Sequence, residues 1–136
     1  HPATVHFPIA LLVLSLGCYG VYLFREEKFY QRGAFGLHLI GVVGMAVAVL
    51  TGNQAQGDLS DEVVLQELVQ QHQISGFVLL WLFGMLLIWR YLRLKRMARW
   101  EQWLFLGLFA AANGLMFYSA HLGGKMVYEH GAGVLL

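Results

Sequence analysis

Residues 33–50 read GAFGLHLIGVVGMAVAVL and contain no Asp, Glu, Lys or Arg. An α-helix rises about 1.5 Å per residue, so about 20 residues cross the roughly 30 Å of hydrocarbon in a bilayer. The stretch is close to that length. Because lipid offers the backbone no water, a segment inside it must be a helix or a strand of a closed barrel. The two-residue alternation of a barrel strand is absent, so the stretch predicts a transmembrane helix.

Three other uncharged stretches have a similar length, at residues 7–24, 68–89 and 102–124. The whole chain is 58% hydrophobic and 12% charged, and its mean hydropathy of +0.59 lies outside the range of ordinary soluble domains. We therefore predict an all-α integral membrane protein, in which residues 1–136 form a single domain with a four-helix up-down bundle. The predicted spans are residues 7–24, 33–51, 72–90 and 101–122.

The basic residues divide unequally between the two sides of this predicted bundle. Eight of the nine Lys and Arg residues follow the first or the third span, and only Lys125 lies on the opposite side. By the positive-inside rule the side with eight is cytoplasmic. We expect a multi-pass protein of the bacterial inner (cytoplasmic) membrane with both termini on the outer, periplasmic side. The basic segment at residues 90–99 lies between two spans, so topology and anionic lipid explain it better than nucleic acid does.

Small residues are frequent in the second and fourth spans. Such residues let helix backbones approach closely, so we expect them to pack inside the bundle; the alternative is that they leave room for a flat cofactor. The pair Gly123-Gly124 predicts the end of the fourth helix. The small residues are Gly36, Gly41, Gly44, Ala46 and Ala48 in the second span and Gly107, Ala110, Ala111 and Gly114 in the fourth.

Five of the six histidines fall on the predicted outer side. His6 opens the first span, His72 opens the membrane part of the third helix, and His121 closes the fourth span. His1 and His130 lie in the adjoining terminal segments. Because a four-helix bundle is narrow, we expect several of these imidazoles to meet in one small volume.

Imidazole is a common ligand of haem iron, zinc and copper. A site at the membrane boundary suits haem, since the macrocycle can lie among apolar side chains while its propionates reach water. Lys125 is the expected propionate partner, because it is the only basic residue on that side. The candidate ligands are His6, His72, His121 and His130. The alternative is that each imidazole is solvated or bonded to a backbone carbonyl.

The remaining residues predict little chemistry. His38 lies inside the second span, where we expect it to bond to a neighbouring helix or to the cytoplasmic boundary; a His38/Met85 haem pair is the other alternative. Cys18 is the only cysteine, so neither an intrachain disulfide nor a CxxCH haem motif exists. No phosphate loop, dinucleotide motif or HExxH occurs. The sequence thus favours an electron-transfer subunit over a stand-alone enzyme.

Two stretches, HPATVHFPIALL at residues 1–12 and GGKMVYEHGAGV at residues 123–134, resemble the signature of a bacterial four-helix membrane family catalogued as a domain of unknown function. The resemblance spans the whole chain. It implies a haem-binding, electron-transferring module that is sometimes found beside cytochromes. His38 and His121 are not part of the family pattern. The matching positions are His1, Pro2, His6, Pro8, His72, Tyr128, His130, Gly131, Gly133 and Val134.

Our leading hypothesis is a membrane-embedded, b-type cytochrome-like electron-transfer subunit with bis-histidine haem near the periplasmic face. It would hold one haem b, or two, and exchange electrons with a periplasmic cytochrome, another redox protein or partner subunits. One alternative is a structural or anchoring subunit of a larger membrane complex. Another is a copper or zinc site formed by the same histidines, with Met126 nearby for copper.

Overall fold

The computed structural model describes residues 2–54, 63–93 and 95–129, and this part of the chain is helical apart from two short connections and residue 129. All four helices are long and apolar enough to cross a membrane. This confirms the predicted all-α membrane fold. The helices are α1 (Pro2–Arg25), α2 (Lys28–Gln54), α3 (Val63–Arg93) and α4 (Arg99–Tyr128).

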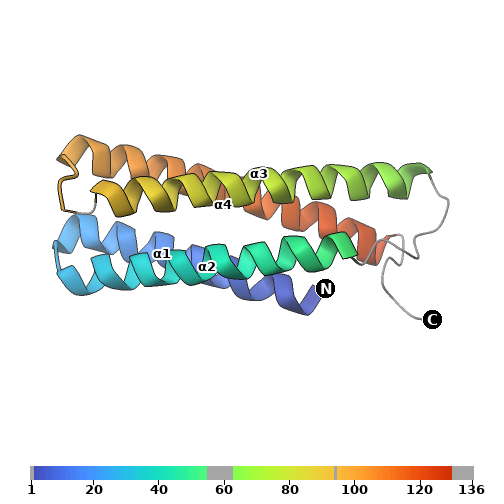
Figure 1. Ribbon diagram of the computed structural model, residues 1–136, viewed down its shortest axis with the longest axis horizontal. Helices are drawn as coiled ribbons and strands as arrows, with labels where there is room; N and C mark the ends of the chain where they lie inside the picture. Colours follow the sequence, from blue (N-terminus) through green and yellow to red (C-terminus); the bar gives the residue numbers. More distant parts are fainter. Residues whose placement is uncertain (1, 55–62, 94, 130–136) are drawn as a thin grey trace.

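Consecutive helices run in opposite directions, so the two ends of the bundle differ (Figure 1). The α1–α2 and α3–α4 connections lie together at one end, which we call the basic end (residues 22–35 and 88–102). The first turns of α1 and α3 and the last turns of α2 and α4 lie at the other, which we call the terminal end. That the basic end is cytoplasmic stays a prediction from the charge distribution.

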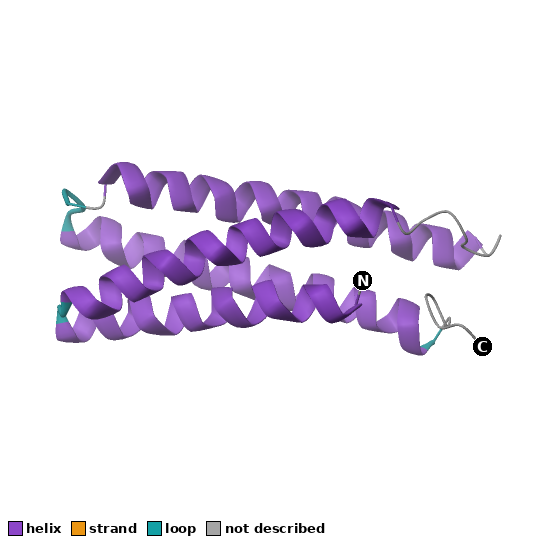
Figure 2. Ribbon diagram, turned by 60° about the horizontal axis from the view of Figure 1, so that its bottom comes forward, coloured by secondary structure: helices purple, strands orange, loops and turns teal. Residues whose placement is uncertain are grey.

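Each helix contacts two neighbours in the described part of the chain. The backbones approach each other closely in the pairs α1–α2, α2–α3, α3–α4 and α1–α4, whereas the diagonal pairs α1–α3 and α2–α4 meet only through side chains in the centre of the bundle. Figure 2 shows the helices crossing at small angles along the length of the bundle. The outer faces carry exposed apolar side chains such as Phe24, Trp81 and Leu92, as expected for helices surrounded by lipid.

The contact between α1 and α2 is the most extensive, and two glycines of α2 allow it. A Cβ placed on Gly41 would overlap the side chain of Leu12, and one placed on Gly44 would lie 3.3 Å from Cβ of Pro8. Pro8 lies inside α1 and is buried against α2. The prediction that small residues of the second span pack inside the bundle is confirmed at these two positions.

The same prediction is wrong for the fourth span. Gly107, Ala110, Ala111 and Gly114 are exposed, and a Cβ on either glycine would meet no atom within 4 Å. The helix instead buries a stripe that includes Phe105, which lies on its opposite side. Periodicity shows which residues share a face, but not which face turns inward. The buried residues of α4 are Phe105, Phe109, Ala112, Asn113, Met116, Ser119 and Leu122.

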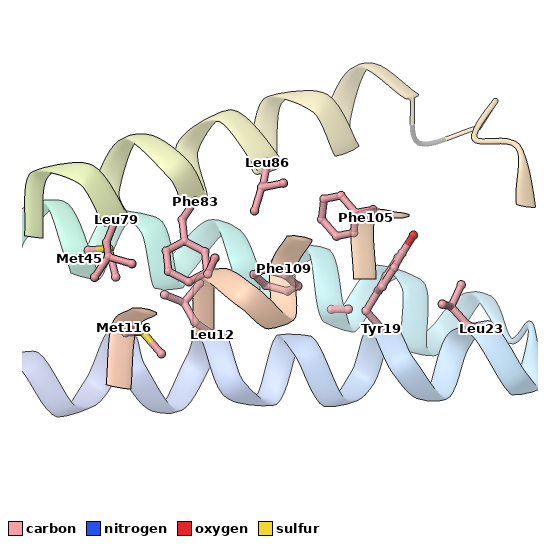
Figure 3. Close-up of a cluster of buried hydrophobic side chains, with 12 residues drawn as sticks. Leu12, Tyr19, Leu23, Met45, Leu79, Phe83, Leu86, Phe105, Phe109 and Met116 are labelled. Atoms are coloured by element: carbon pink, nitrogen blue, oxygen red, sulfur yellow. The ribbon is translucent and has the colours of Figure 1, made fainter. Parts of the chain in front are cut away.

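The centre of the bundle is filled by side chains from all four helices (Figure 3). Phe83 of α3 meets Phe109 of α4 edge to face, with ring centroids 5.7 Å apart. Phe105 packs against Tyr19 of α1 in the same manner at 5.0 Å. Such edge-to-face pairs fix the relative heights of the helices. The labelled core residues are Leu12, Tyr19, Leu23, Met45, Leu79, Phe83, Leu86, Phe105, Phe109 and Met116.

A two-residue turn, Glu26 and Glu27, joins α1 to α2 at the basic end. Glu26 has a φ of 54°, and its N–H donates to the carbonyl of Tyr22 at 2.7 Å. A residue in the left-handed conformation with this hydrogen bond is a common helix C-cap, and here it ends α1 and reverses the chain. The Glu26 carboxylate pairs with Arg99 of α4 at 2.9 Å. The turn therefore fixes where α2 begins relative to α4.

Candidate functional site

His72 of α3 is the predicted ligand that points into the bundle. It is half-buried, and its Nδ1 lies 3.0 Å from the backbone carbonyl of Ser119 on α4. A carbonyl can only accept a hydrogen bond, so Nδ1 carries the proton and donates it. The lone pair of the neutral ring is then on Nε2. A metal-binding histidine often donates its second nitrogen to a carbonyl in this way, and a structural histidine such as His38 makes the same kind of bond.

Two serine hydroxyls support this assignment of the proton on His72. Ser75 Oγ donates to the carbonyl of His72 at 2.7 Å and lies 2.7 Å from Ser119 Oγ. Since the Ser75 proton is used on the carbonyl, Ser119 must donate to Ser75. Ser119 Oγ, which is 3.4 Å from His72 Nδ1, then has no proton to give to the ring. The hydrogen bonds are therefore satisfied together only when Nδ1 is protonated.

Because Gly123 has no side chain, the His72 ring can lie close to the backbone of α4. A Cβ at Gly123 would lie 3.2 Å from Cε1 of His72 and 3.7 Å from Nε2. The prediction that Gly123-Gly124 ends the fourth helix is wrong, since α4 continues to Tyr128. These glycines are helical, and Gly123 lets an imidazole of the neighbouring helix lie close to the backbone.

The other predicted ligands are placed differently. His6 on α1 and His121 on α4 are exposed, and Lys125 on α4 is half-buried. His130 lies outside the described residues, as does His1. Within the described ranges, no group of three His, Cys, Asp or Glu side chains is positioned to hold a metal ion. Among the described candidates, His72 has its ring held against the backbone of a neighbouring helix by a hydrogen bond.

His38 has a structural role at the centre of the bundle. Its side chain is 0% exposed, and Nε2 donates to the carbonyl of Phe83 on α3 at 3.0 Å. The ring stacks on Phe109 at 4.6 Å. This confirms that His38 bonds to a neighbouring helix. Met85 is 60% exposed on α3, so it does not share the buried site of His38.

Arg90 is a buried residue that sequence reasoning missed. The sequence marks it only as one charge among several at the end of a span, yet its side chain is 1% exposed. Its guanidinium lies 4.5 Å from the ring of Tyr19. The one available signal was its position directly after an uncharged run that ends in Trp89.

Comparison with protein-family models matches residues 1–135 to the family described as "Predicted membrane protein (DUF2231)". The chain belongs to the DUF2231 family. This confirms the resemblance to a membrane family catalogued as a domain of unknown function. Comparison of this DUF2231 chain with curated proteins and with solved structures gave no significant match. The family description specifies a membrane protein, in agreement with the four apolar helices.

Proposed function

We propose that this DUF2231 protein is a membrane electron-transfer subunit that holds haem b through His72 at the terminal end. The observation that carries the proposal is the hydrogen bond of the His72 ring: Nδ1 donates to the Ser119 carbonyl at 3.0 Å, which leaves the Nε2 lone pair for iron. The half-buried ring lies at the terminal end of the bundle, and a haem with an apolar body and charged propionates suits the membrane boundary that we expect there.

The residues around His72 suit a rigid ligand. The hydroxyls of Ser75 and Ser119 pair at 2.7 Å and join α3 to α4 beside the ring. Because Gly123 has no Cβ, α4 leaves room for the imidazole. Lys125 lies at the same end of α4, and we propose it as the partner of a propionate. The Ser119 carbonyl orients the ring, and the hydroxyl pair joins the two helices beside it.

The second axial ligand would come from His6, His121 or His130. Bound haem b supplies reversible one-electron chemistry, and histidines at both axial positions favour electron relay over substrate binding. We therefore assign the protein a role in passing electrons to or from a redox partner or partner subunits of a membrane complex. Copper or zinc at the same imidazole is the competing occupant.

The test is an absorption spectrum of the full-length protein, reduced minus oxidised, with a pyridine haemochrome assay for haem type and stoichiometry. We expect b-type bands in the wild-type protein. His72→Ala should lose them or convert them to a high-spin form. Gly123→Ala keeps the imidazole but places a methyl group 3.2 Å from its present Cε1 position, so it should shift the bands without abolishing them.

The matched control is His38→Gln, which removes a buried imidazole away from the proposed ligand set and should keep the spectrum. An unchanged spectrum in a folded His72→Ala variant would refute the assignment of His72. A folded wild-type protein without haem but with stoichiometric copper or zinc would support the metal-site alternative. One with neither would support the structural or anchoring subunit.

A further inference from the structure

The basic end contains a pocket of about 330 Å³, far from His72. It lies between the first two turns of α2 and the α3–α4 connection. Three of its five lining side chains are cationic, and no carboxylate lines it. The lining residues are Lys28, Gln31, Arg32, Phe35 and Lys95.

The carboxylates of the basic end do not neutralise this pocket. Glu101 pairs with Arg93 at 2.6 Å, and Glu26 pairs with Arg99 at 2.9 Å. Glu27 forms no ion pair with any described residue. The same holds for each of the three lining cations in the described part of the chain, so none of them is neutralised by an ion pair.

Arg90 adds a fourth positive charge behind the pocket. Its Nη2 donates to the carbonyl of Gln31 at 3.1 Å, and its guanidinium lies 5.9 Å from the ring of Phe35. Both of these residues line the pocket. The side chain is 1% exposed, and Nε and Nη1 have no described hydrogen-bond partner. A buried charge without a counter-ion is weakly screened, so it raises the positive potential in the pocket.

The start of α2 adds to the same field. Lys28 is the first residue of this 27-residue helix, and the other α2 residues of the pocket follow within two turns. A helix N-terminus carries a partial positive charge and unpaired N–H groups, which favour phosphate. Cations, helix terminus and buried guanidinium therefore point to one ligand chemistry, a phosphate group.

The surroundings of the pocket favour a phosphate attached to acyl chains. Phe35 lines the pocket and stacks with exposed Tyr91 of α3, with ring centroids 6.3 Å apart. One turn farther toward the centre of the bundle, Leu39 and Ile88 are exposed and apolar. A phospholipid could place its phosphate among the cations and its chains along this surface. A soluble phosphate would not use the apolar part.

We propose that this pocket binds the phosphate of an anionic phospholipid in the leaflet at the basic end. Basic pockets between helices on that side of a membrane protein are a known type of lipid site. The proposal is independent of haem binding, because it uses a different end of the bundle.

The test is native mass spectrometry of the full-length protein in a neutral detergent, with phosphatidylglycerol added at defined ratios. A micelle of neutral detergent has no charged surface, so it does not attract basic residues nonspecifically as an anionic membrane would. The variants are Arg32→Gln, Lys95→Gln and the double variant. Arg25→Gln and Arg96→Gln are matched controls, because each removes an exposed cation of the same end that does not line the pocket.

We expect each pocket variant to weaken phosphatidylglycerol binding by about fivefold, since one cation near an anionic lipid contributes about 1 kcal/mol. The double variant should lose about 25-fold, and the controls should stay within about twofold of wild type. Phosphatidylcholine should bind more weakly than phosphatidylglycerol, and millimolar inorganic phosphate should not displace the lipid.

Three outcomes would overturn the proposal. Equal losses in controls and pocket variants would mean diffuse attraction by the basic end. Displacement of lipid by inorganic phosphate would mean a site for a soluble anion. Equal binding of phosphatidylcholine and phosphatidylglycerol by the wild-type protein would mean that the cations do not select the ligand.

Discussion

Gly41→Ala is the substitution that tests the helix packing most directly. The new Cβ would lie 2.8 Å from Cγ and 2.9 Å from Cδ2 of Leu12 on α1. Both separations are shorter than the optimal distance between carbon atoms, by about 0.6 Å or more. Leu12 is 0% exposed, and Cγ is the branch point of its side chain, so a simple rotation does not relieve the overlap. The substitution must push α1 and α2 apart or force Leu12 out of its rotamer.

The expected loss follows from two opposed effects on the free energy of unfolding. Overpacking a well-filled core costs about 1–3 kcal/mol. Replacing a helical glycine with alanine recovers about 1 kcal/mol of helix propensity. Gly36→Ala, on the same helix, is the matched control, because its Cβ would meet no atom within 4 Å. The propensity gain is common to both variants, so the control should be more stable than Gly41→Ala by about 1–3 kcal/mol.

The assay is equilibrium unfolding in mixed micelles by titration with sodium dodecyl sulfate, followed by circular dichroism. Leu12→Ala in the Gly41→Ala background should cost less than the sum of the two single changes, because the truncated side chain leaves room for the methyl group. If Gly41→Ala is as stable as Gly36→Ala, the close approach of α1 and α2 at this height is refuted.

Three further substitutions probe the polar groups. Arg90→Met should leave the free energy of unfolding unchanged or raise it, because it removes two buried nitrogens without described partners. A decrease in the free energy of unfolding of more than about 2 kcal/mol in the same titration would contradict this expectation. Ser119→Ala should cost about 1 kcal/mol and should keep the b-type spectrum that we propose for the wild-type protein, since the backbone carbonyl that holds His72 remains. Loss of that spectrum in the variant alone would mean that the hydroxyl positions the ring. Arg93→Gln should cost about 0–1 kcal/mol, because its ion pair with Glu101 is partly exposed; a larger loss on unfolding would show that the pair holds the α3–α4 connection.

The four helices could be predicted from the sequence because the physical constraint is local. An uncharged run of about 20 residues in lipid has to satisfy its own backbone, and only a helix does so within one segment. The end of α4 could not be predicted in the same way. Gly123-Gly124 weakens a helix by about 1 kcal/mol per residue, and packing against α3 overrides that preference. The His72 ring lies where a Cβ at Gly123 would crowd it, which explains the glycine. Because His72 belongs to α3, this reason is not visible in the sequence of α4 itself.

The rotation of each helix about its axis could not be predicted, which is why the small residues of α2 and α4 were assigned alike. In a soluble bundle the apolar stripe faces inward, but lipid is as apolar as the core, so hydrophobicity does not orient a transmembrane helix. Gly41 of α2 packs against α1, whereas Gly107 of α4 faces outward. Arg90 was missed for the same reason, since its burial depends on how α3 is turned toward the ring of Tyr19.

Hydrogen bonds from side chains to backbone carbonyls provide the orientation that hydrophobicity does not. Every pair of neighbouring helices has at least one such bond, and a bond of this kind forms only when the donor faces the adjacent helix at the correct height. The bonds run from Ser15 to Ala34 (α1–α2), from His38 to Phe83 and from Arg90 to Gln31 (α2–α3), from His72 to Ser119 (α3–α4), and from Arg99 to Leu23 (α4–α1). Two of the donors, His72 and Arg90, belong to the proposed haem site and to the proposed lipid pocket. The polar residues that hold the rotation of α3 are thus also residues on which the two proposals rest, so a substitution that rotates this helix should disturb both proposed sites although they lie at opposite ends of the bundle.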